Sequence, residues 1–251
     1  MCEHRPAGAG ERDESMRLIL DSIEKHFGDK QVLKGASFTF EQGRIYGLLG
    51  RNGAGKTTLM NCLAGEYPPD GGLFSVERGG AAGPLEEGDV GYVLSTPVVP
   101  EFLTGWEFVK FFTEIAGTPR DAGRTPDDWL DLVGIDGEDR GRLMKDYSHG
   151  MKNKMQMLCF LIARPPIILL DEPLTSFDVV AAKEMKDLLL DMKKDHIILF
   201  STHILQLAAD LCDEIVLLHH GVLEEVDNAI IHTTAFEERV VALLKEEESH
   251  D

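Results

Sequence analysis

The stretch Gly50-Arg51-Asn52-Gly53-Ala54-Gly55-Lys56-Thr57 has the pattern GxxxxGK(S/T), and the fold of the chain depends on it. It follows the apolar run 44–49, which predicts a strand, and it opens a segment that predicts a helix to about Leu63. In such a loop the glycines allow backbone N–H groups to surround phosphates, Lys56 meets the β- and γ-phosphates, and Thr57 ligates Mg²⁺. The sequence therefore predicts a nucleotide-phosphate loop between a strand and a helix.

A second motif with the same kind of chemistry lies further along the chain. The apolar run 167–170 ends in two carboxylates, Asp171 and Glu172. Acidic residues at the carboxyl end of a buried strand lie where a doubly wound sheet binds its ligands. We expect Asp171 to hold Mg²⁺ through water, and Glu172 to polarise the attacking water as general base. Alone, an apolar strand with an acidic turn is commonplace, so this assignment depends on its position after the phosphate loop.

The rest of the chain alternates between strand and helix patterns. Two β-like runs at 18–27 and 32–40, separated by Gly28-Asp29-Lys30, predict an antiparallel hairpin. Later helices are expected at 108–115, 126–133, 148–163, 179–193 and 203–211, and later strands at 89–94, 167–170, 196–201, 214–219 and 222–226. Because strands that alternate with helices form parallel sheets, the fold class is predicted to be α/β with a mostly parallel sheet.

The composition limits the possible partners. The 251 residues include 44 Asp and Glu against 25 Lys and Arg, which gives a formal charge of −19. Binding along a nucleic-acid backbone needs clustered basic residues, so we expect no nucleic-acid partner. The 43% of hydrophobic residues predicts a globular protein. The four cysteines are scattered along the chain, which argues against a Cys/His metal cluster.

The start of the chain and its apolar runs bear on its location. Residues 1–15 are polar and contain no apolar stretch typical of a secretory signal, so we expect a flexible tail, with Met16 as an alternative start. The apolar runs are far shorter than the roughly 20 residues that cross a bilayer. We therefore expect a cytoplasmic protein without membrane-spanning segments.

Four further motifs occur in an order that matches a known family. Tyr147-Ser148-His149-Gly150-Met151 precedes the two carboxylates, Leu174-Thr175-Ser176-Phe177-Asp178 follows them, and Ser201-Thr202-His203 closes a strand. Upstream of all of them, Phe27 lies in Lys25-His26-Phe27-Gly28. Together with the phosphate loop and the carboxylates, these motifs resemble those of the ATP-binding cassette proteins, the nucleotide-binding subunits of ABC transporters. The resemblance covers residues 17 to about 226.

The resemblance implies a detailed architecture. It predicts a P-loop NTPase core with a mostly parallel sheet, an antiparallel N-terminal β-subdomain and an inserted α-helical subdomain. A single ATP-binding cassette domain is then expected over 16–251. Its core is expected at about 16–96 and 160–226, its helical subdomain at about 97–159, and a C-terminal helix at about 228–247.

The resemblance also implies roles for single residues toward ATP and Mg²⁺. The expected ATP-binding residues are Phe27, Gly50, Asn52, Gly53, Ala54, Gly55, Lys56, Thr57 and Thr58. In a head-to-tail dimer, Ser148, His149 and Gly150 would contact the ATP of the partner protomer, although His149 and Met151 diverge from the family's LSGGQ signature. His203 would contact the γ-phosphate beside the base Glu172, and Asp178 would belong to the D-loop. Two of these residues also have a purely structural explanation. Ser148 could be a helix cap, and Phe27 could be a core residue.

One position departs from the family pattern. The family usually has a glutamine after a GYVPQ-like strand, where its side chain meets Mg²⁺, but here the stretch is Gly91-Tyr92-Val93-Leu94-Ser95. Because Ser95 is shorter, we expect it to reach the metal only through water, or hydrolysis to be slow. The other expected Mg²⁺ ligands are Thr57 and Asp171.

A cluster of aromatic residues follows this strand: Phe102, Trp106, Phe108, Phe111 and Phe112. In the resembled family, the corresponding helices form a groove for a short helix of the membrane permease. The spacing of 108, 111, 112 and 115 favours a second interpretation, in which these residues fill the core of the helical subdomain. The expected partners are a permease that docks near the helical subdomain and a second copy of the chain or a homologous cassette.

The leading hypothesis is an ATP-hydrolysing subunit, peripheral on the inner face of the cell membrane, that powers an ABC transporter. The short form and the divergent signature look like subunits of bacterial exporters of drug, peptide or antibiotic-like substrates. One alternative is a cassette ATPase without transport, of the iron–sulfur assembly or cell-wall regulator type. Another is a binding-only regulator with weakened hydrolysis, against which the presence of Lys56, Glu172 and His203 argues.

Overall fold

The computed structural model describes residues 15–116, 123–173 and 179–227, and single positions at 229, 231, 233, 236, 238 and 240. Residues 1–14 of the expected tail lie outside the described residues. So do the expected D-loop with Asp178 and most of the expected helix at 228–247.

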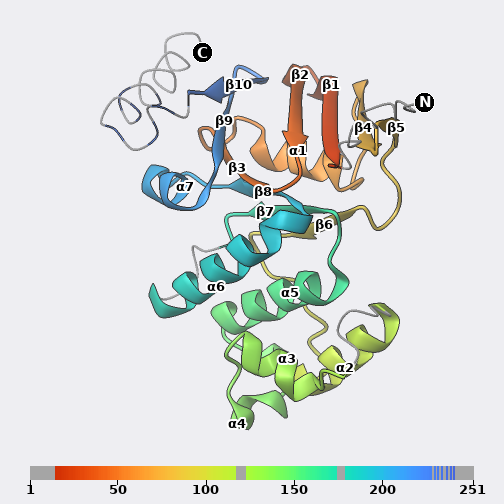
Figure 1. Ribbon diagram of the computed structural model, residues 1–251, viewed down its shortest axis with the longest axis vertical. Coiled ribbons are helices and arrows are strands. Elements are labelled where there is room, and N and C mark those ends of the chain that lie inside the picture. Colours follow the sequence, from red (N-terminus) through yellow and green to blue (C-terminus); the bar gives the residue numbers. More distant parts are fainter. Residues whose placement is uncertain are drawn as a thin grey trace, which may run out of the picture.

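The first part of the chain forms a four-stranded antiparallel sheet (Figure 1). Its order is β2-β1-β4-β5, with β1 (Arg17–Phe27), β2 (Lys30–Glu41), β4 (Gly71–Arg78) and β5 (Ala81–Pro84). β1 and β2 form the predicted hairpin, in which Phe27 pairs with Lys30 next to the turn.

A six-stranded sheet forms the centre of the molecule. Its order is β10-β9-β3-β8-β7-β6, with β3 (Arg44–Leu49), β6 (Val90–Val93), β7 (Ile167–Asp171), β8 (Ile197–Ser201), β9 (Glu214–His219) and β10 (Val222–Val226). All neighbouring strands in this sheet are parallel except β9 and β10, which form an antiparallel pair at one edge. The predicted fold class, α/β with a mostly parallel sheet, is confirmed.

The central strands are buried on both faces and contribute to three clusters of buried residues, two of which include residues of β7. In β7, Ile167 and Leu169 pack into a core shared with the antiparallel sheet and with α1 (Lys56–Leu63). Ile168 and Leu170 pack on the opposite face, into a core shared with the other helices. Successive side chains of a strand point to opposite faces, which explains why these strands are continuous apolar runs in the sequence.

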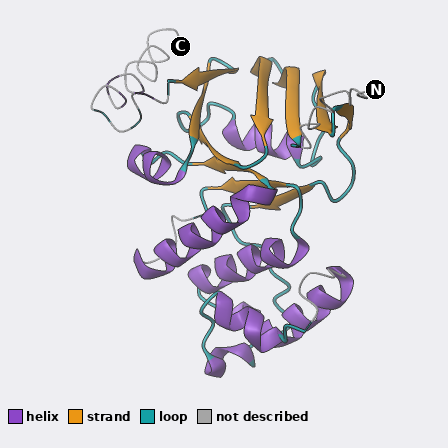
Figure 2. Cartoon of the chain, in the orientation of Figure 1, coloured by secondary structure: helices purple, strands orange, loops and turns teal. Residues whose placement is uncertain are grey.

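The helices are placed around this sheet, as Figure 2 shows. Besides α1 they are α2 (Gly105–Ala116), α3 (Pro126–Leu132), α4 (Gly137–Arg140), α5 (His149–Ala163), α6 (Val179–Met192), α7 (Leu205–Leu211) and the 3₁₀ turns η2 (Met144–Asp146) and η3 (Lys193–Asp195). α1 lies between the two sheets, whereas α2, α3 and α4 lie at the far end from the antiparallel sheet (Figure 1). Among the described residues, no helix combines the length and apolarity needed to cross a bilayer.

The ends of α5 follow from its sequence. Its predicted N-cap is confirmed, because the Ser148 hydroxyl accepts a hydrogen bond of 3.2 Å from the backbone N–H of Met151. The helix ends at Ala163, and its C-cap Arg164 has a φ of 49°, outside the helical region, just before Pro165.

The aromatic residues of α2 do not form the single buried face that their spacing predicts. Gly105 and Val109 are buried, and Trp106, Phe108, Phe112 and Ala116 are partly buried against the core, whereas Phe111 and Ile115 are more than half exposed. The prediction that the aromatic residues fill the core is therefore confirmed for Trp106, Phe108 and Phe112 and wrong for Phe102 and Phe111. Because apolar residues lie on more than one side of the helix, the sequence alone does not decide which side faces the core; the positions of the neighbouring helices decide it.

Close packing between β6 and α5 gives a first testable prediction. A β-carbon on Gly91 would lie 2.4 Å from Cε1 of Phe160 and 2.5 Å from Cγ of Pro165. We expect Gly91→Ala to lower the free energy of unfolding by about 1–3 kcal/mol, because the strand and the helix must move apart. Chemical denaturation measures this. Gly83→Ala in β5 is the matched control, since a β-carbon there meets no further atom within 4 Å, and equal losses in both variants would contradict the prediction.

Candidate active site

The loop 50–55 joins β3 to α1 in a conformation that requires its glycines. Gly53 and Gly55 have φ angles of 87° and 107°, in the left-handed region that other residues rarely adopt. Gly50 is needed for a different reason, since a β-carbon there would lie 2.6 Å from the carbonyl oxygen of Leu218 in β9. Within the loop, the backbone N–H of Ala54 donates to the carbonyl of Arg51 over 3.1 Å. The loop therefore forms a compact turn directly before the N-terminus of α1.

The side chain of Lys56 lies inside this loop. Its Nζ donates to the carbonyl oxygens of Gly50 at 2.7 Å and Arg51 at 3.0 Å, and the residue is buried. A buried ammonium needs such acceptors. These bonds place one positive charge beside the backbone N–H groups at the start of α1, which is an arrangement suited to an anion.

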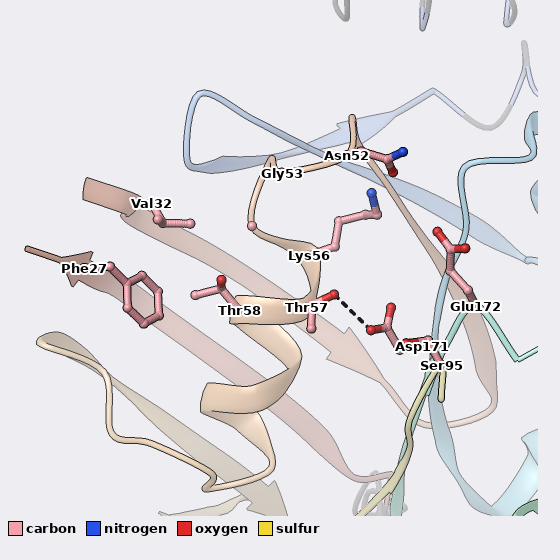
Figure 3. Close-up of a pocket in the computed structure, with 11 residues that line it drawn as sticks. Phe27, Val32, Asn52, Gly53, Lys56, Thr57, Thr58, Ser95, Asp171 and Glu172 are labelled. Atoms are coloured by element: carbon pink, nitrogen blue, oxygen red, sulfur yellow. Dashed lines mark hydrogen bonds between the residues drawn. The ribbon is translucent and has the colours of Figure 1, made fainter. Parts of the chain in front are cut away.

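The carboxylate of Asp171 connects α1 with the two central strands. Asp171 ends β7 and is only 4% exposed. Its Oδ2 accepts a hydrogen bond of 2.9 Å from the Thr57 hydroxyl (Figure 3), and its Oδ1 accepts a short one from the hydroxyl of Ser201. Ser201 is fully buried and pairs with Asp171 in the parallel register of β7 and β8.

Glu172 and His203 extend this arrangement beyond the ends of the two strands. The backbone N–H of Glu172 lies 3.2 Å from both the carbonyl oxygen and the hydroxyl of Ser201. Glu172 has a φ of 50°, a conformation that is costly for a residue other than glycine. Its Oε1 is 2.9 Å from Nδ1 of His203. The two expected catalytic residues are therefore in direct contact.

Lys56, Thr57, Asp171 and Glu172 face one cavity of about 330 Å³ (Figure 3). It is lined by Phe27, Val32, Asn52, Gly53, Gly55, Lys56, Thr57, Thr58, Ser95, Asp171 and Glu172. At one end lies the ring of Phe27, which is 49% exposed and therefore does not belong to the core. At the other end lie Lys56 and the carboxylates. The cavity thus has an aromatic end and a charged end.

The remaining expected site residues lie outside this cavity. Gly50 and His203 line a neighbouring cavity of about 300 Å³, which shares Asn52 with the first. Ser148 and His149 are exposed at the start of α5, and Gly150 is half-buried; none of the three lines either cavity. Asp178 lies outside the described residues. One chain therefore brings together the expected phosphate, metal and base residues and leaves the signature residues on a separate surface.

The donor atoms beside Asp171 are suitable for Mg²⁺. The hydroxyl of Thr57 and the carboxylate of Asp171 are hard oxygen ligands, the type that this ion prefers. Ser95 lines the same cavity with a further hydroxyl and is exposed.

Comparison with known proteins agrees with this geometry. The profile of the ABC transporter family matches residues 33–175, more than half of the chain. The chain belongs to the ABC transporter family. It is 34% identical over 218 residues to an ABC transporter ATP-binding protein of Methanocaldococcus jannaschii, a match that covers 84% of this chain and 79% of that protein. The protein is an ATPase, since the cassettes of this family hydrolyse ATP to power transport.

Other ABC proteins are similarly close to this chain. It is 30% identical to the bacitracin transport ATP-binding protein of Enterococcus faecalis, over 86% of this chain and 70% of that protein. It is 32% identical to the fluoroquinolones export ATP-binding protein of Mycobacterium tuberculosis strain H37Rv, over 78% and 65%. A solved ATP-binding subunit of an ABC transporter superposes with a TM-score of 0.77 at 26% identity, covering 89% of this chain and 98% of that one.

The structure of this ABC protein adds residues that motif reasoning missed. Ser201 is part of the Ser201-Thr202-His203 motif, yet its contact with Asp171 becomes visible only when β7 and β8 are known to be neighbours. Val32 lines the cavity from β2. The hydroxyl of Tyr92 is buried near Asp171, and burial together with the charge of that carboxylate raises the pKa of Tyr92.

The Ser201 hydroxyl gives a second testable prediction. We expect Ser201→Ala to lower the free energy of unfolding by about 1–3 kcal/mol, because the buried carboxylate of Asp171 loses one of its two hydroxyl donors. Denaturant titration at neutral pH measures the loss. Ser95→Ala, at an exposed serine of the same cavity, is expected to change stability by less than about 0.5 kcal/mol. A Ser201→Ala variant as stable as Ser95→Ala would show that the hydroxyl does not support the carboxylate.

Proposed function

We propose that this ABC protein is the ATP-hydrolysing subunit of a membrane exporter and that two copies close head to tail on two ATP molecules. The main support is the single cavity that joins an exposed aromatic ring to Lys56 and the Asp171–Glu172 pair. An adenine nucleotide has the same polarity, with an aromatic base at one end and a polyanion at the other. Phe27 offers a ring face to the base, and loop 50–55 with Lys56 offers N–H groups and a positive charge to the phosphates.

Within this proposal the catalytic roles follow from the contacts of Glu172. Its carboxylate is positioned to accept a proton from the water that attacks the γ-phosphate. His203 holds that carboxylate through the 2.9 Å contact. The hydrogen bonds that the backbone N–H of Glu172 donates to Ser201 keep the carboxylate at the end of β7.

Mg²⁺ is proposed to be held by Thr57 and Asp171, with Ser95 as a ligand through water. When bound, the ion neutralises phosphate charge and orients the transferred group. Thr57 and Asp171 already lie 2.9 Å apart, so the two ligands come from elements that are held together by their own hydrogen bond. Ser95 would replace the usual glutamine of the family at greater distance from the ion.

The dimer is proposed because the signature residues are available to another molecule. Ser148 and His149 begin the 15-residue helix α5 and are exposed, and the helix N-terminus carries a partial positive charge. A nucleotide in the cavity of one protomer would gain these donors from its partner. In the head-to-tail arrangement, each of the two nucleotide sites would receive the α5 donors of the opposite protomer.

A permease is the proposed second partner, and its docking site is proposed beside α2. Val98, Phe102, Phe111 and Ile115 are exposed to between 54% and 78%. Large exposed apolar side chains on adjoining segments are typical of interaction surfaces.

Because the chain would act at a permease, we propose a location on the inner face of the membrane. The names of the bacitracin and fluoroquinolone relatives support an antibiotic-like substrate for that permease.

The catalytic proposal is tested with Glu172→Gln. We expect turnover to fall by about 10²–10⁴-fold, because the general base is lost while the residues that contact ATP remain. ATP binding is expected to persist, and ATP-bound dimers are expected to accumulate on size exclusion. Lys56→Ala serves as the contrasting variant, with loss of both binding and dimers. ATPase activity in Glu172→Gln equal to that of the unchanged protein would refute the role of Glu172.

The role of Ser95 is tested by restoring the usual side chain. We expect Ser95→Gln to lower the Mg²⁺ concentration for half-maximal ATPase activity by about tenfold, the effect of one added contact of about 1.4 kcal/mol. Ser95→Ala is expected to leave it near its original value. If Ser95→Gln changes neither the rate nor the Mg²⁺ requirement, the position does not contribute to metal binding.

A further inference from the structure

A buried lysine at the end of β1 is not used by the phosphate chemistry. Lys25 is only 8% exposed, although lysine is almost never buried unless it is paired. Its Nζ donates to the carbonyl oxygen of Pro68 at 2.7 Å and to Oδ1 of Asp70 at 3.0 Å. Both partners belong to the segment between α1 and β4. The lysine therefore fastens this segment to the last residues of β1.

The same ammonium group faces two aromatic rings. Nζ of Lys25 lies 5.9 Å from the ring centroid of Phe27 and 5.2 Å from that of Tyr67. Both distances are within the range of cation–π attraction, which is stronger where the cation is desolvated. The two rings also contact each other edge to face, with centroids 5.7 Å apart and an angle of 88° between their planes. The ring of Phe27 is thus held in place by contacts with a cation and a second aromatic ring.

Tyr67 connects this group to the helix that follows the phosphate loop. Its hydroxyl accepts a hydrogen bond of 3.3 Å from Nδ2 of Asn61, which belongs to α1. α1 begins at Lys56, so a short path of contacts runs from the phosphate loop through Asn61 and Tyr67 to the ring of Phe27.

Asp70 fixes the other side of the segment. Besides Lys25, it accepts a 2.6 Å hydrogen bond from the backbone N–H of His26, and its own N–H donates to the carbonyl of Glu24 at 2.8 Å. The hydrogen bond from His26, followed by that from Lys25, lowers the pKa of Asp70. The carboxylate is therefore charged at neutral pH and remains a partner for Lys25.

We infer that Lys25, Tyr67 and Asp70 are positioning residues for the nucleotide base, because together they hold the Phe27 ring at a set distance from the phosphate loop. This inference rests on the proposed function, in which the base stacks on Phe27. The three residues hold the Phe27 ring and do not line the part of the cavity proposed for the phosphates. Their contribution is accordingly confined to ligands that carry a base.

The experiment compares two ligands on the full-length chain. ATP has a base, whereas inorganic tripolyphosphate has the same phosphates without one, and calorimetry gives the dissociation constant of each. We expect Lys25→Met and Tyr67→Leu each to weaken ATP binding by about three- to tenfold and to leave tripolyphosphate binding unchanged. In ATPase assays the same variants raise KM for ATP and keep kcat, as the loss of uniform binding requires.

Two controls separate positioning from folding and from charge. Lys30→Met removes the same charge at the exposed residue that pairs with Phe27 across the hairpin, and it is expected to bind both ligands as the unchanged chain does. Tyr67→Phe keeps the ring against Phe27 and loses only the hydroxyl, so ATP affinity is expected to stay within about twofold. Tyr67→Leu retains the Lys25–Asp70 pair, and it carries the test if Lys25→Met does not fold.

The outcomes distinguish this inference from the proposed function. If Phe27→Ala weakens ATP binding while Lys25→Met and Tyr67→Leu do not, the base binds at Phe27 as proposed, and the positioning role of Lys25 and Tyr67 is refuted. Equal weakening of ATP and tripolyphosphate binding in Tyr67→Leu also refutes it, because the residue would then act on the fold of the whole site. If Phe27→Ala leaves ATP affinity unchanged, the proposed base site is wrong, and the inference falls with it.

Discussion

The hydrogen bonds to one buried carboxylate hold the nucleotide site together. Asp171 needs donors because an isolated charge is costly inside a protein, and it obtains them from Thr57 on α1 and from Ser201 on β8. These bonds fix the helix after the phosphate loop against two central strands. Since β7 and β8 are parallel and in register at this point, the residues that follow them, Glu172 and His203, reach the same edge of the sheet.

The acidity of the chain does not conflict with an anionic ligand. A formal charge of −19 is spread over the surface, where salt screens charges beyond roughly 8 Å at physiological ionic strength. The charged end of the cavity has Lys56 and the backbone N–H groups at the start of α1 at close range. Local donors therefore decide binding there, whereas the net charge bears on ligands that contact a broad surface, such as nucleic acid.

The parts of the fold that could be predicted from the sequence are those with local causes. The phosphate loop, the Ser148 cap and the apolar strands each depend on neighbours in the chain, and they are found where the sequence indicates them. The contacts of Ser201 could not be predicted, because they depend on which strands lie side by side. Which aromatic residues of α2 pack inward could not be predicted for the same reason, since Phe111 and Phe112 are equally apolar and only the neighbouring helices select one. Likewise, nothing local in the sequence indicates that Lys25 meets Tyr67.

The division of the hydrophobic residues into separate cores has an evolutionary consequence. The central sheet separates the packing beneath the phosphate loop from the packing around α2, α3 and α5. Substitutions among the helices change the volume of one core and leave the other as it was. Sequence drift can therefore remodel the helical surface without disturbing the packing beneath the phosphate loop.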